Sequence, residues 1–258
     1  MKQGDLFGAS GWAANQLLAG MTETELDKLL PMLEWQQLPV RSRLESRGRA
    51  IERAHFLLGG VASQIGTTRF GTQADVAMLG SEGMTGVVLL LGGVRSSTDC
   101  VMQIAGESLS IDRRAFQGLL ERRPALNAYL LRYVKALLAQ MANNCIAQAR
   151  AKIEERLARC ILMCCDRMGS DRISLTHEAL SEMVSTRRAS VTNALHQLEG
   201  DGVIRATRAS IQLLDRPSLI KYAGGFYGSA EGEHQRILEQ MRFQIAEEKK
   251  VVSPCHAP

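Results

Sequence analysis

Two adjacent arginines, Arg187 and Arg188, stand where a helix is expected to begin in the segment LTHEALSEMVSTRRASVTNALHQLEGDGVIR, residues 175–205. The N-terminus of a helix carries a partial positive charge, so two cations at this position cost stability in an isolated fold. The pair becomes favourable when phosphate oxygens or guanine edges accept its hydrogen bonds. These residue types and their spacing therefore indicate a surface that binds nucleic acid.

The elements around the arginine pair predict a winged helix–turn–helix. Thr176 can cap a first short helix, and a second helix begins at about Arg187 after a brief turn. Both helices have apolar residues at helical spacing: Ala179, Leu180 and Met183 in the first, and Val191, Ala194, Leu195 and Leu198 in the second. In such a motif the N-terminal residues of the second helix enter the DNA major groove. The stretch GDGVIRATRASIQLLD that follows predicts a turn, a strand, a tight turn and a strand, which is the pattern of a wing.

Double-stranded DNA is therefore the expected partner, and several side chains could contact it. Arg187 can read a base or clamp a phosphate, and Arg205 and Arg208 of the wing can touch the DNA backbone. Polar side chains of the two helices and their turn are expected to make the backbone contacts that fix the register, namely His177, Ser185, Thr186, Ser190 and Thr192.

The bulk properties agree with a DNA-binding protein and exclude other classes. The chain has 258 residues, a net charge of +4, 45% hydrophobic and 22% charged residues, which suits a globular protein with room for two domains. No apolar run reaches the roughly 20 residues that cross a bilayer, and the first residues lack the apolar core of a signal peptide. We therefore expect a cytoplasmic location and no membrane partner. The sequence has no phosphate loop, no G-x-S-x-G, no H-E-x-x-H and no metal-ligand spacing among its histidines, so we expect neither an enzyme nor a metal site.

The remainder of the chain predicts an α+β fold. Residues 11–35 have a helical pattern, and from about 38 to 111 glycines separate short alternating runs, which predicts an antiparallel β-roll of jelly-roll type with flanking helices. The helical period then returns and lasts to about Met168, where Gly169 ends it. We divide the chain into a roll domain (1–124), a long dimerisation and hinge helix (125–168), the winged helix–turn–helix (169–227) and a helical tail (228–258).

The long helix has a regular apolar seam. Four residues follow the 4-3-4 spacing of a coiled-coil interface, namely Leu130, Val134, Leu137 and Met141. Such a helix can be buried inside its own domain or can pair with its copy. Because compact blocks precede and follow the helix, we expect a parallel homodimer. The polar Asn144 and Gln148, which continue the seam, can fix the register or face a ligand.

The order of these blocks over about residues 15–220 resembles the Crp/Fnr family of bacterial transcription regulators. LESRGRAIERAHFLLGGVASQI is similar to the family's first roll hairpin, and SVTNALHQLEGDGVI to its recognition helix and the step into the wing. The resemblance implies a dimer that places two recognition helices about 34 Å apart in successive major grooves of a near-palindromic site. An activator would also contact RNA polymerase, but no residue pattern identifies a surface for it.

The resemblance also suggests which residues read bases. Arg188 lies where the family has an arginine that can pair bidentately with guanine. Ala189 and Asn193 stand where many members have a glutamate and a second arginine. An alanine methyl can contact thymine and an asparagine can pair with adenine, so the half-site should differ from the family's best-known one.

The family's roll holds a cyclic nucleotide in a segment that corresponds here to GSEGMTGVVLLLGGVRSSTDC. Arg95 and Ser96 match the end of that segment, but Met84, after Gly83, replaces the carboxylate that holds the ribose. We therefore expect no cofactor, and neither cAMP nor cGMP as effector. Gly83, Met84, Arg95, Ser96 and Asn144 are candidates for a pocket that takes another ligand. Alternatively, Arg95 forms a salt bridge and the roll serves only structure.

A thiol-responsive regulator is the alternative function. Cys145, or the group Cys160, Cys164 and Cys165, could sense an oxidant, although a free cysteine on a helix is more often a small buried apolar residue. A haem sensor has little support, because His55 is the one histidine of the roll.

Overall fold

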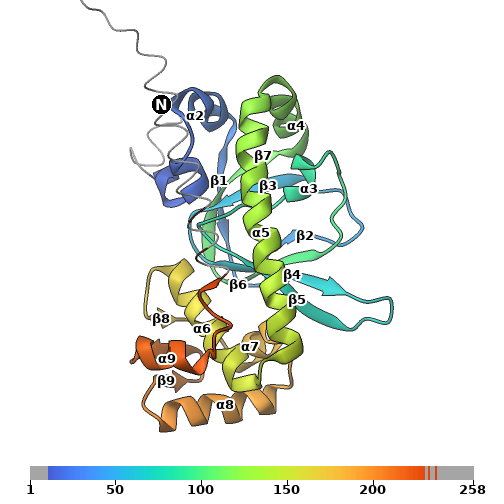
Figure 1. The fold of residues 1–258 in the computed structure, drawn as a ribbon. Helices are drawn as coiled ribbons and strands as arrows, with labels where there is room; N and C mark the ends of the chain where they lie inside the picture. Colours follow the sequence, from blue (N-terminus) through green and yellow to red (C-terminus); the bar gives the residue numbers. More distant parts are fainter. Residues whose placement is uncertain (1–10, 230–231, 233–235, 237–258) are drawn as a thin grey trace, which may run out of the picture.

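The computed structural model describes residues 11–229, 232 and 236. Figure 1 shows a β-roll in its upper part, a helical domain with a small sheet below it, and the long helix α5 beside both. The predicted α+β class and the order of its parts are confirmed. The predicted tail, 228–258, lies outside the described residues except for 228, 229, 232 and 236.

Among the described residues, four short helical segments precede the roll: η2 (Gly11–Ala14), α1 (Gln16–Ala19), α2 (Glu23–Leu29) and η3 (Leu30–Met32). Asn15 caps α1 by accepting from the backbone N–H groups of Leu17 and Leu18. Its Nδ2 donates to the carbonyls of Leu57 and Gly83. One buried amide therefore ties the first helix to two segments of the roll.

Seven strands build the roll: β1 (Glu34–Leu38), β2 (Arg43–Glu45), β3 (Arg53–Leu57), β4 (Val61–Thr67), β5 (Gln73–Leu79), β6 (Asp99–Ile104) and β7 (Gly106–Asp112). They form two antiparallel sheets of order β1-β7-β3 and β2-β6-β4-β5, with α3 (Val87–Leu90) between β5 and β6. Phe56 of β3 meets Phe116 of the following helix α4 (Arg113–Arg122) edge to face at 6.3 Å between ring centroids. The predicted roll is thus present, and its two sheets enclose an apolar core.

The predicted continuous helix to Met168 is interrupted. Helix α5 (Pro124–Arg150) ends where Ala151 turns extended, and α6 (Ile153–Met168) starts anew with the backbone N–H of Lys152 donating to Glu155 at 2.6 Å. Gly169, at φ 57°, ends α6 as predicted. The periodicity missed the break because both helices have apolar residues at helical spacing on each side of it.

The face of α5 that was predicted to pair with a second copy is instead buried within the chain. Leu130, Val134 and Leu137 are at most 7% exposed and pack in the core of the roll, and Met141 packs partly against it. A 4-3-4 seam is equally the pattern of a core-facing helix, so spacing alone could not separate the two packings. A neighbouring face, about 100° around the helix axis, keeps an exposed or half-exposed apolar stripe, the α5 stripe, made of Leu131, Leu138, Ala142, Cys145 and Ile146.

The C-terminal part is a winged helix–turn–helix, as predicted. It contains β8 (Arg172–Ile173), α7 (His177–Met183), α8 (Arg188–Gly200), β9 (Ile204–Thr207), β10 (Ser210–Leu213) and α9 (Arg216–Tyr222). The strands form a small sheet of order β8-β10-β9. Helix α6 shares its apolar core with α7, α8 and α9, so it belongs structurally to this domain rather than to the long helix. Within the described residues no helix is long and apolar enough to span a membrane.

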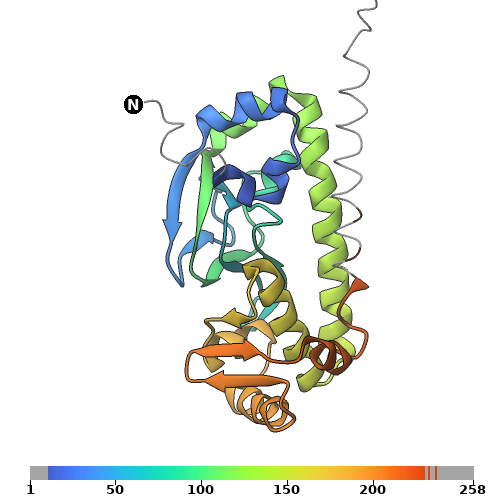
Figure 2. The ribbon, with the colours of Figure 1, turned by 90° about the vertical axis from the view of Figure 1, so that its left-hand side faces the viewer.

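The roll and the C-terminal domain are in direct contact. The sheet β2-β6-β4-β5 contributes three residues to the apolar cluster around Cys164 of α6, namely Val61, Met78 and Ile104. Figure 2 shows α5 along one side of the roll and reaching down to the lower domain. Changes in the pose of the lower domain would therefore have to break apolar contacts with the roll.

The fit of α5 against the roll is tight at Gly83. A Cβ atom at this position would overlap the buried phenol of Tyr133, whose hydroxyl donates to the carbonyl of Met84 at 3.3 Å. Gly59 lies in open space, with nothing within 4 Å of an added Cβ.

We expect Gly83→Ala to lower the free energy of unfolding by about 1–3 kcal/mol, because Tyr133 must move in a packed core. Urea denaturation of the variant, with Gly59→Ala as the matched control, measures the effect. Equal stability of the two variants would show that α5 does not press on the roll at this point.

Candidate nucleic-acid interface

The helix–turn–helix presents the N-terminus of α8 to solvent. Thr176 caps α7 by accepting from the N–H of Ala179 at 3.1 Å, as predicted. Arg187 is the N-cap of α8, has extended backbone and supplies no capping side chain. The first N–H groups of α8 therefore lack a side-chain acceptor and can point at an anion.

Four arginines surround this end of α8 or lie in the wing, and all four are exposed: Arg187, Arg188, Arg205 and Arg208. None of their side chains has a hydrogen bond or an ion pair with another residue in the part of the chain that the structure describes. The first turn of α8 also contains no acidic residue. The positive charge is thus left for an external acceptor such as a phosphate.

The exposed face of α8 carries the predicted base-reading residues. Ala189 and Asn193 are exposed and lie one turn apart, on the side away from the buried Val191, Ala194 and Leu195. Figure 1 shows α8 at the bottom edge of the molecule, away from the roll. The structure therefore brings Arg188, Ala189 and Asn193 together on one accessible surface.

Two of the predicted backbone contacts are bonded to each other. The hydroxyl of Thr192 donates to the carbonyl of Arg188 at 3.1 Å, and its oxygen lies 3.0 Å from Nδ1 of His177. Because the hydroxyl proton is used, Nδ1 of His177 must carry the proton of the second bond. The pair fixes the start of α7 against the first turn of α8.

Ser185 lies apart from the arginine surface. It adopts a left-handed backbone at φ 49°, and its Oγ accepts from the backbone N–H of Asp75 at 3.3 Å and from Nε2 of Gln148 at 3.4 Å. The turn of the helix–turn–helix is therefore held by β5 and α5. Thr186 lines a cleft at the same junction, whereas Ser190 is half-buried in α8.

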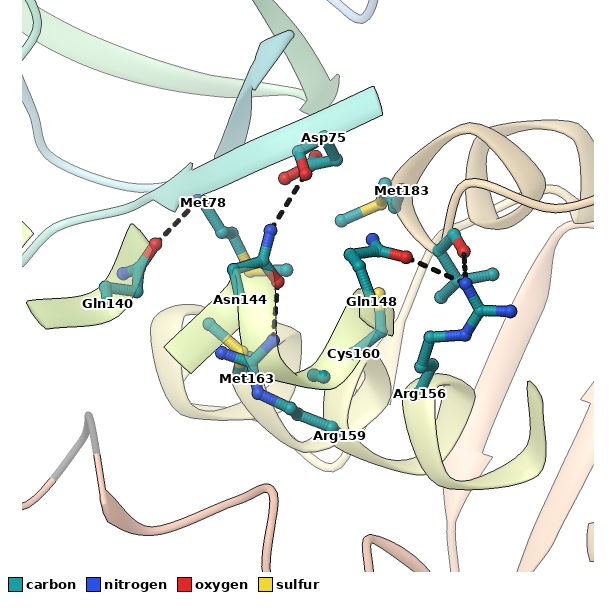
Figure 3. A pocket seen from close by; sticks show the side chains of 12 residues that line it. Asp75, Met78, Gln140, Asn144, Gln148, Arg156, Arg159, Cys160, Met163 and Met183 are labelled. Atoms are coloured by element: carbon teal, nitrogen blue, oxygen red, sulfur yellow. Dashed lines mark hydrogen bonds between the residues drawn. The ribbon is translucent and has the colours of Figure 1, made fainter. Parts of the chain in front are cut away.

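A partly buried polar network joins the three parts at this junction, as Figure 3 shows. Asn144 of α5 donates to the carbonyl of Asp75 at 2.8 Å and accepts from Nη1 of Arg159 at 2.9 Å. Gln148 accepts from Arg156, which also donates to the carbonyl of Val184, just before the turn. The two polar residues that continue the predicted seam therefore connect the roll, α5 and the DNA-binding domain.

The carboxyl group of Asp75 sits at the centre of the junction. Burial raises its pKa to about 7, although the hydroxyl of Ser63 and the charges of Arg159 and Arg167 partly oppose the shift. The sequence did not indicate a role for Asp75, because an aspartate in a strand of alternating polarity is expected to lie on the solvent-exposed face. Only the packing of the lower domain against β5 buries it.

The predicted effector pocket is not assembled. Gly83 and Met84 are packed against Tyr133, and Arg95 is exposed and donates to the carbonyl of Gly48 at 2.8 Å. Asn144 lies at the junction instead. The salt bridge considered for Arg95 is therefore absent among the described residues, and a carbonyl takes its place.

A carboxylate of the chain itself occupies the donors next to Ser96. Glu45 is 4% exposed, and its two oxygens accept from the backbone N–H of Gly86 and from the hydroxyl of Ser96, both at 2.7 Å. The Gly86 N–H precedes the short helix α3, and the Ser96 hydroxyl follows it. A backbone donor and a hydroxyl of this kind are suited to an anion, and Glu45 already supplies one.

The cysteines of α6 are shielded. Cys160, Cys164 and Cys165 are at most 5% exposed. A hydrogen bond with Cys160 together with burial raises the pKa of Cys164 well above its usual value, and burial raises that of Cys165 to about 12. Buried thiols that stay protonated react poorly with oxidants. Among the described cysteines, Cys145 on the α5 stripe is the exposed one.

Comparisons with known proteins agree with this geometry. Residues 155–222, which extend from α6 to α9, match the Crp-like helix-turn-helix domain. The chain is 25% identical over 173 residues to a global nitrogen regulator of Synechocystis, with 64% of this chain and 77% of that protein covered. It is 22% identical over 216 residues to a CRP-like cAMP-activated global transcriptional regulator of Mycobacterium tuberculosis, with 80% and 96% covered.

A solved structure gives the same fold. A transcriptional regulator of the Crp/Fnr family from Eubacterium rectale superimposes with a TM-score of 0.63 at 13% identity, with 81% of this chain and 98% of that chain covered.

The exposed arginine at the start of α8 generates a quantitative expectation. We expect Arg188→Ala to weaken binding to the preferred duplex by about 1–3 kcal/mol and to relax the preference at one base pair of each half-site. Titration of matched and single-base-changed duplexes at one salt concentration measures both effects. An equal loss on every duplex would make Arg188 a phosphate contact that reads no base.

Proposed function

Because the chain belongs to the Crp/Fnr family of transcription regulators, we propose that it acts as a homodimer on a near-palindromic DNA site, without control by a cyclic nucleotide. The single observation that carries the DNA-reading role is the uncapped, arginine-bearing N-terminus of α8 with Ala189 and Asn193 on its exposed face. Such a helix end is suited to sequence-specific DNA binding, since it attracts phosphate and offers side chains to base edges.

The α5 stripe supports the homodimer. Leu138 is 60% and Ile146 is 54% exposed, an unusual cost for large apolar side chains on one helix face. Residues 131, 138 and 145 are seven apart, and the exposed Ala142 lies between the last two, which is the spacing of a two-stranded coiled coil. The dimer seam we propose is therefore rotated by one residue from the seam that the sequence predicted.

The position of Glu45 supports independence from cyclic nucleotides. Its carboxylate uses the Gly86 N–H and the Ser96 hydroxyl. A nucleotide phosphate in their place would have to displace a buried, hydrogen-bonded carboxylate and leave it unpaired, which is costly. Tyr133 and Met84 add bulk where a ligand would have to fit. We accordingly propose that the protein needs neither cAMP nor cGMP, nor another cofactor.

Selection of bound duplexes from random DNA tests the proposal, with purified full-length protein, fixed salt and no added ligand. We expect a near-palindrome whose half-sites are about 10 base pairs apart, and the same result with cAMP or cGMP present. Enrichment only when a cyclic nucleotide is added would overturn the ligand independence. Enrichment of a single half-site would overturn the homodimer. No enrichment under any of these conditions would overturn the role of α8 in sequence-specific DNA binding.

A charge in the α5 stripe should separate the two copies. We expect Leu138→Asp to raise the dimer dissociation constant by at least about tenfold, because a buried unpaired carboxylate opposes association. Sedimentation analysis measures the change, and Phe70→Asp, at a 90% exposed residue of the β4–β5 hairpin, is the control. A Leu138→Asp protein that remains fully dimeric would place the interface on another face.

A thiol response remains the second candidate function, and Cys145 is the residue that favours it. The side chain is exposed on the α5 stripe, so in the proposed dimer it would lie close to its copy. Loss of oxidant sensitivity of DNA binding in Cys145→Ser would support this role, whereas unchanged or absent sensitivity would count against it.

A further inference from the structure

A cleft of about 430 Å³ lies between the outer face of the sheet β2-β6-β4-β5 and the helix–turn–helix. Volumes of about 300–1,000 Å³ are usual for small-molecule sites. The roll contributes Arg41, Arg43, Asp75, Asp99 and Gln103, and the other wall contains Ser181, Glu182, Ser185 and Thr186. The cleft is separate from the region of Gly83 and Ser96, where the sequence predicted an effector pocket.

The carboxamide of Gln103 marks the buried end of the cleft. The residue is 2% exposed, and neither Nε2 nor Oε1 has a hydrogen-bond partner among the described residues. Oδ2 of Asp75, a residue that is 7% exposed and lines the same cleft, also lacks one. Buried polar groups are nearly always paired, because an unpaired one loses its bonds to water. The ammonium group of a ligand would satisfy two of these three atoms, Oδ2 of Asp75 and Oε1 of Gln103.

The rim of the cleft carries charges of both signs. Arg41 pairs with Glu182 of α7 at 2.7 Å, and Arg43 pairs with Asp99 at 2.5 Å. The arginine side chains are 50% and 57% exposed, so these ion pairs contribute little net stability and exchange readily. A carboxylate from outside can therefore replace Glu182 or Asp99 at an arginine.

We propose that this cleft binds a small zwitterion of the α-amino acid class. Its ammonium group lies at the buried end against the Asp75 carboxylate and the Gln103 carbonyl oxygen. Its carboxylate lies at the rim against Arg41 or Arg43. The arrangement gives acceptors to the ammonium group and donors to the carboxylate. It also places a positive charge beside a carboxyl group that has no hydrogen-bonded cation among the described residues.

The surroundings of Asp75 fit this polarity. Arg159 and Arg167 of α6 act on its carboxyl group from one side, while Asp99 and Glu182 line the cleft on the other. Burial nonetheless raises the pKa of Asp75 to about 7, so the ionised form is short of compensating charge. A bound ammonium group would supply that charge, and binding should weaken as the pH falls below 7 and Asp75 takes up a proton.

Occupation of the cleft would also change the junction. A ligand carboxylate on Arg41 releases Glu182, the residue three positions before Ser185 in the helix–turn–helix turn. The roll would then hold the DNA-binding domain through fewer contacts. This regulatory consequence rests on the proposed function, but binding of the zwitterion does not.

Isothermal calorimetry on the full-length protein, without DNA, tests the site with each of the twenty L-amino acids as the probe. For any amino acid that binds, the amine without its carboxylate and the acid without its ammonium group are the matched ligands. We expect each analogue to bind at least about tenfold more weakly, since each loses a charge-assisted contact. We also expect weaker binding at pH 5 than at pH 8, and Asp75→Asn should remove that difference.

Two variants link the binding to this cleft. Gln103→Leu removes the unpaired amide with little change in volume, and Arg41→Gln removes a rim cation. We expect each to weaken binding about tenfold or more, while Arg53→Gln, which alters a pair with Glu34 elsewhere on the roll, leaves it unchanged. No binding by any of the twenty amino acids, or equal binding by all variants, overturns the proposal. Because no DNA is present, either result stands apart from the outcome of the DNA selection.

Discussion

The packing of α5 on the roll is the contact on which the other features depend. Its buried face, with Leu130 and Leu137, closes the core of the roll and brings Tyr133 against Gly83. The same rotation of the helix leaves Leu138 exposed and directs Asn144 toward β5. A turn of the helix by one residue would exchange these roles, since neighbouring residues of a helix lie about 100° apart. The packed core of the roll, the exposure of the α5 stripe and the position of Asn144 at the junction are therefore consequences of one helix orientation.

A buried carboxylate of the roll itself, that of Glu45, takes the hydrogen bonds of Gly86 and Ser96. In a protein that binds a phosphate ligand, backbone and hydroxyl donors are left open until the ligand arrives. Here Glu45 at the end of β2 reaches the N–H of Gly86 and the hydroxyl of Ser96, and both lie in the loop that the family uses for its ligand. The replacement of a ribose-binding carboxylate by Met84 was visible in the sequence. The carboxylate that accepts from these two donors is 41 and 51 residues away from them in the sequence, so only the fold reveals it.

The accuracy of the sequence-based predictions depended on the range of the interactions. The helix–turn–helix, its Thr176 cap and the wing were predictable, because caps, turns and buried positions there are set by neighbours within a few residues. Which face of α5 is buried was not predictable, because Leu130 and Val134 have a spacing that suits both a core-facing helix and a coiled coil. The side-chain direction of Arg95 was also not predictable. A resemblance in sequence cannot show that this side chain turns outward to the carbonyl of Gly48. The buried state of Asp75 required knowledge of how two domains pack.

The junction gives a physical route from the roll to the recognition helix. Ser185 adopts a left-handed backbone, a conformation that costs energy for a residue with a side chain, and its hydroxyl is held by β5 and α5. Arg187, the N-cap of α8, follows two residues later. A shift of β5 relative to α5 would therefore relax or tighten the turn that sets the start of α8. Contacts with β5 and α5 offset the strain at Ser185, so a change in those contacts would alter the start of α8, which lies at the edge of the molecule away from the roll.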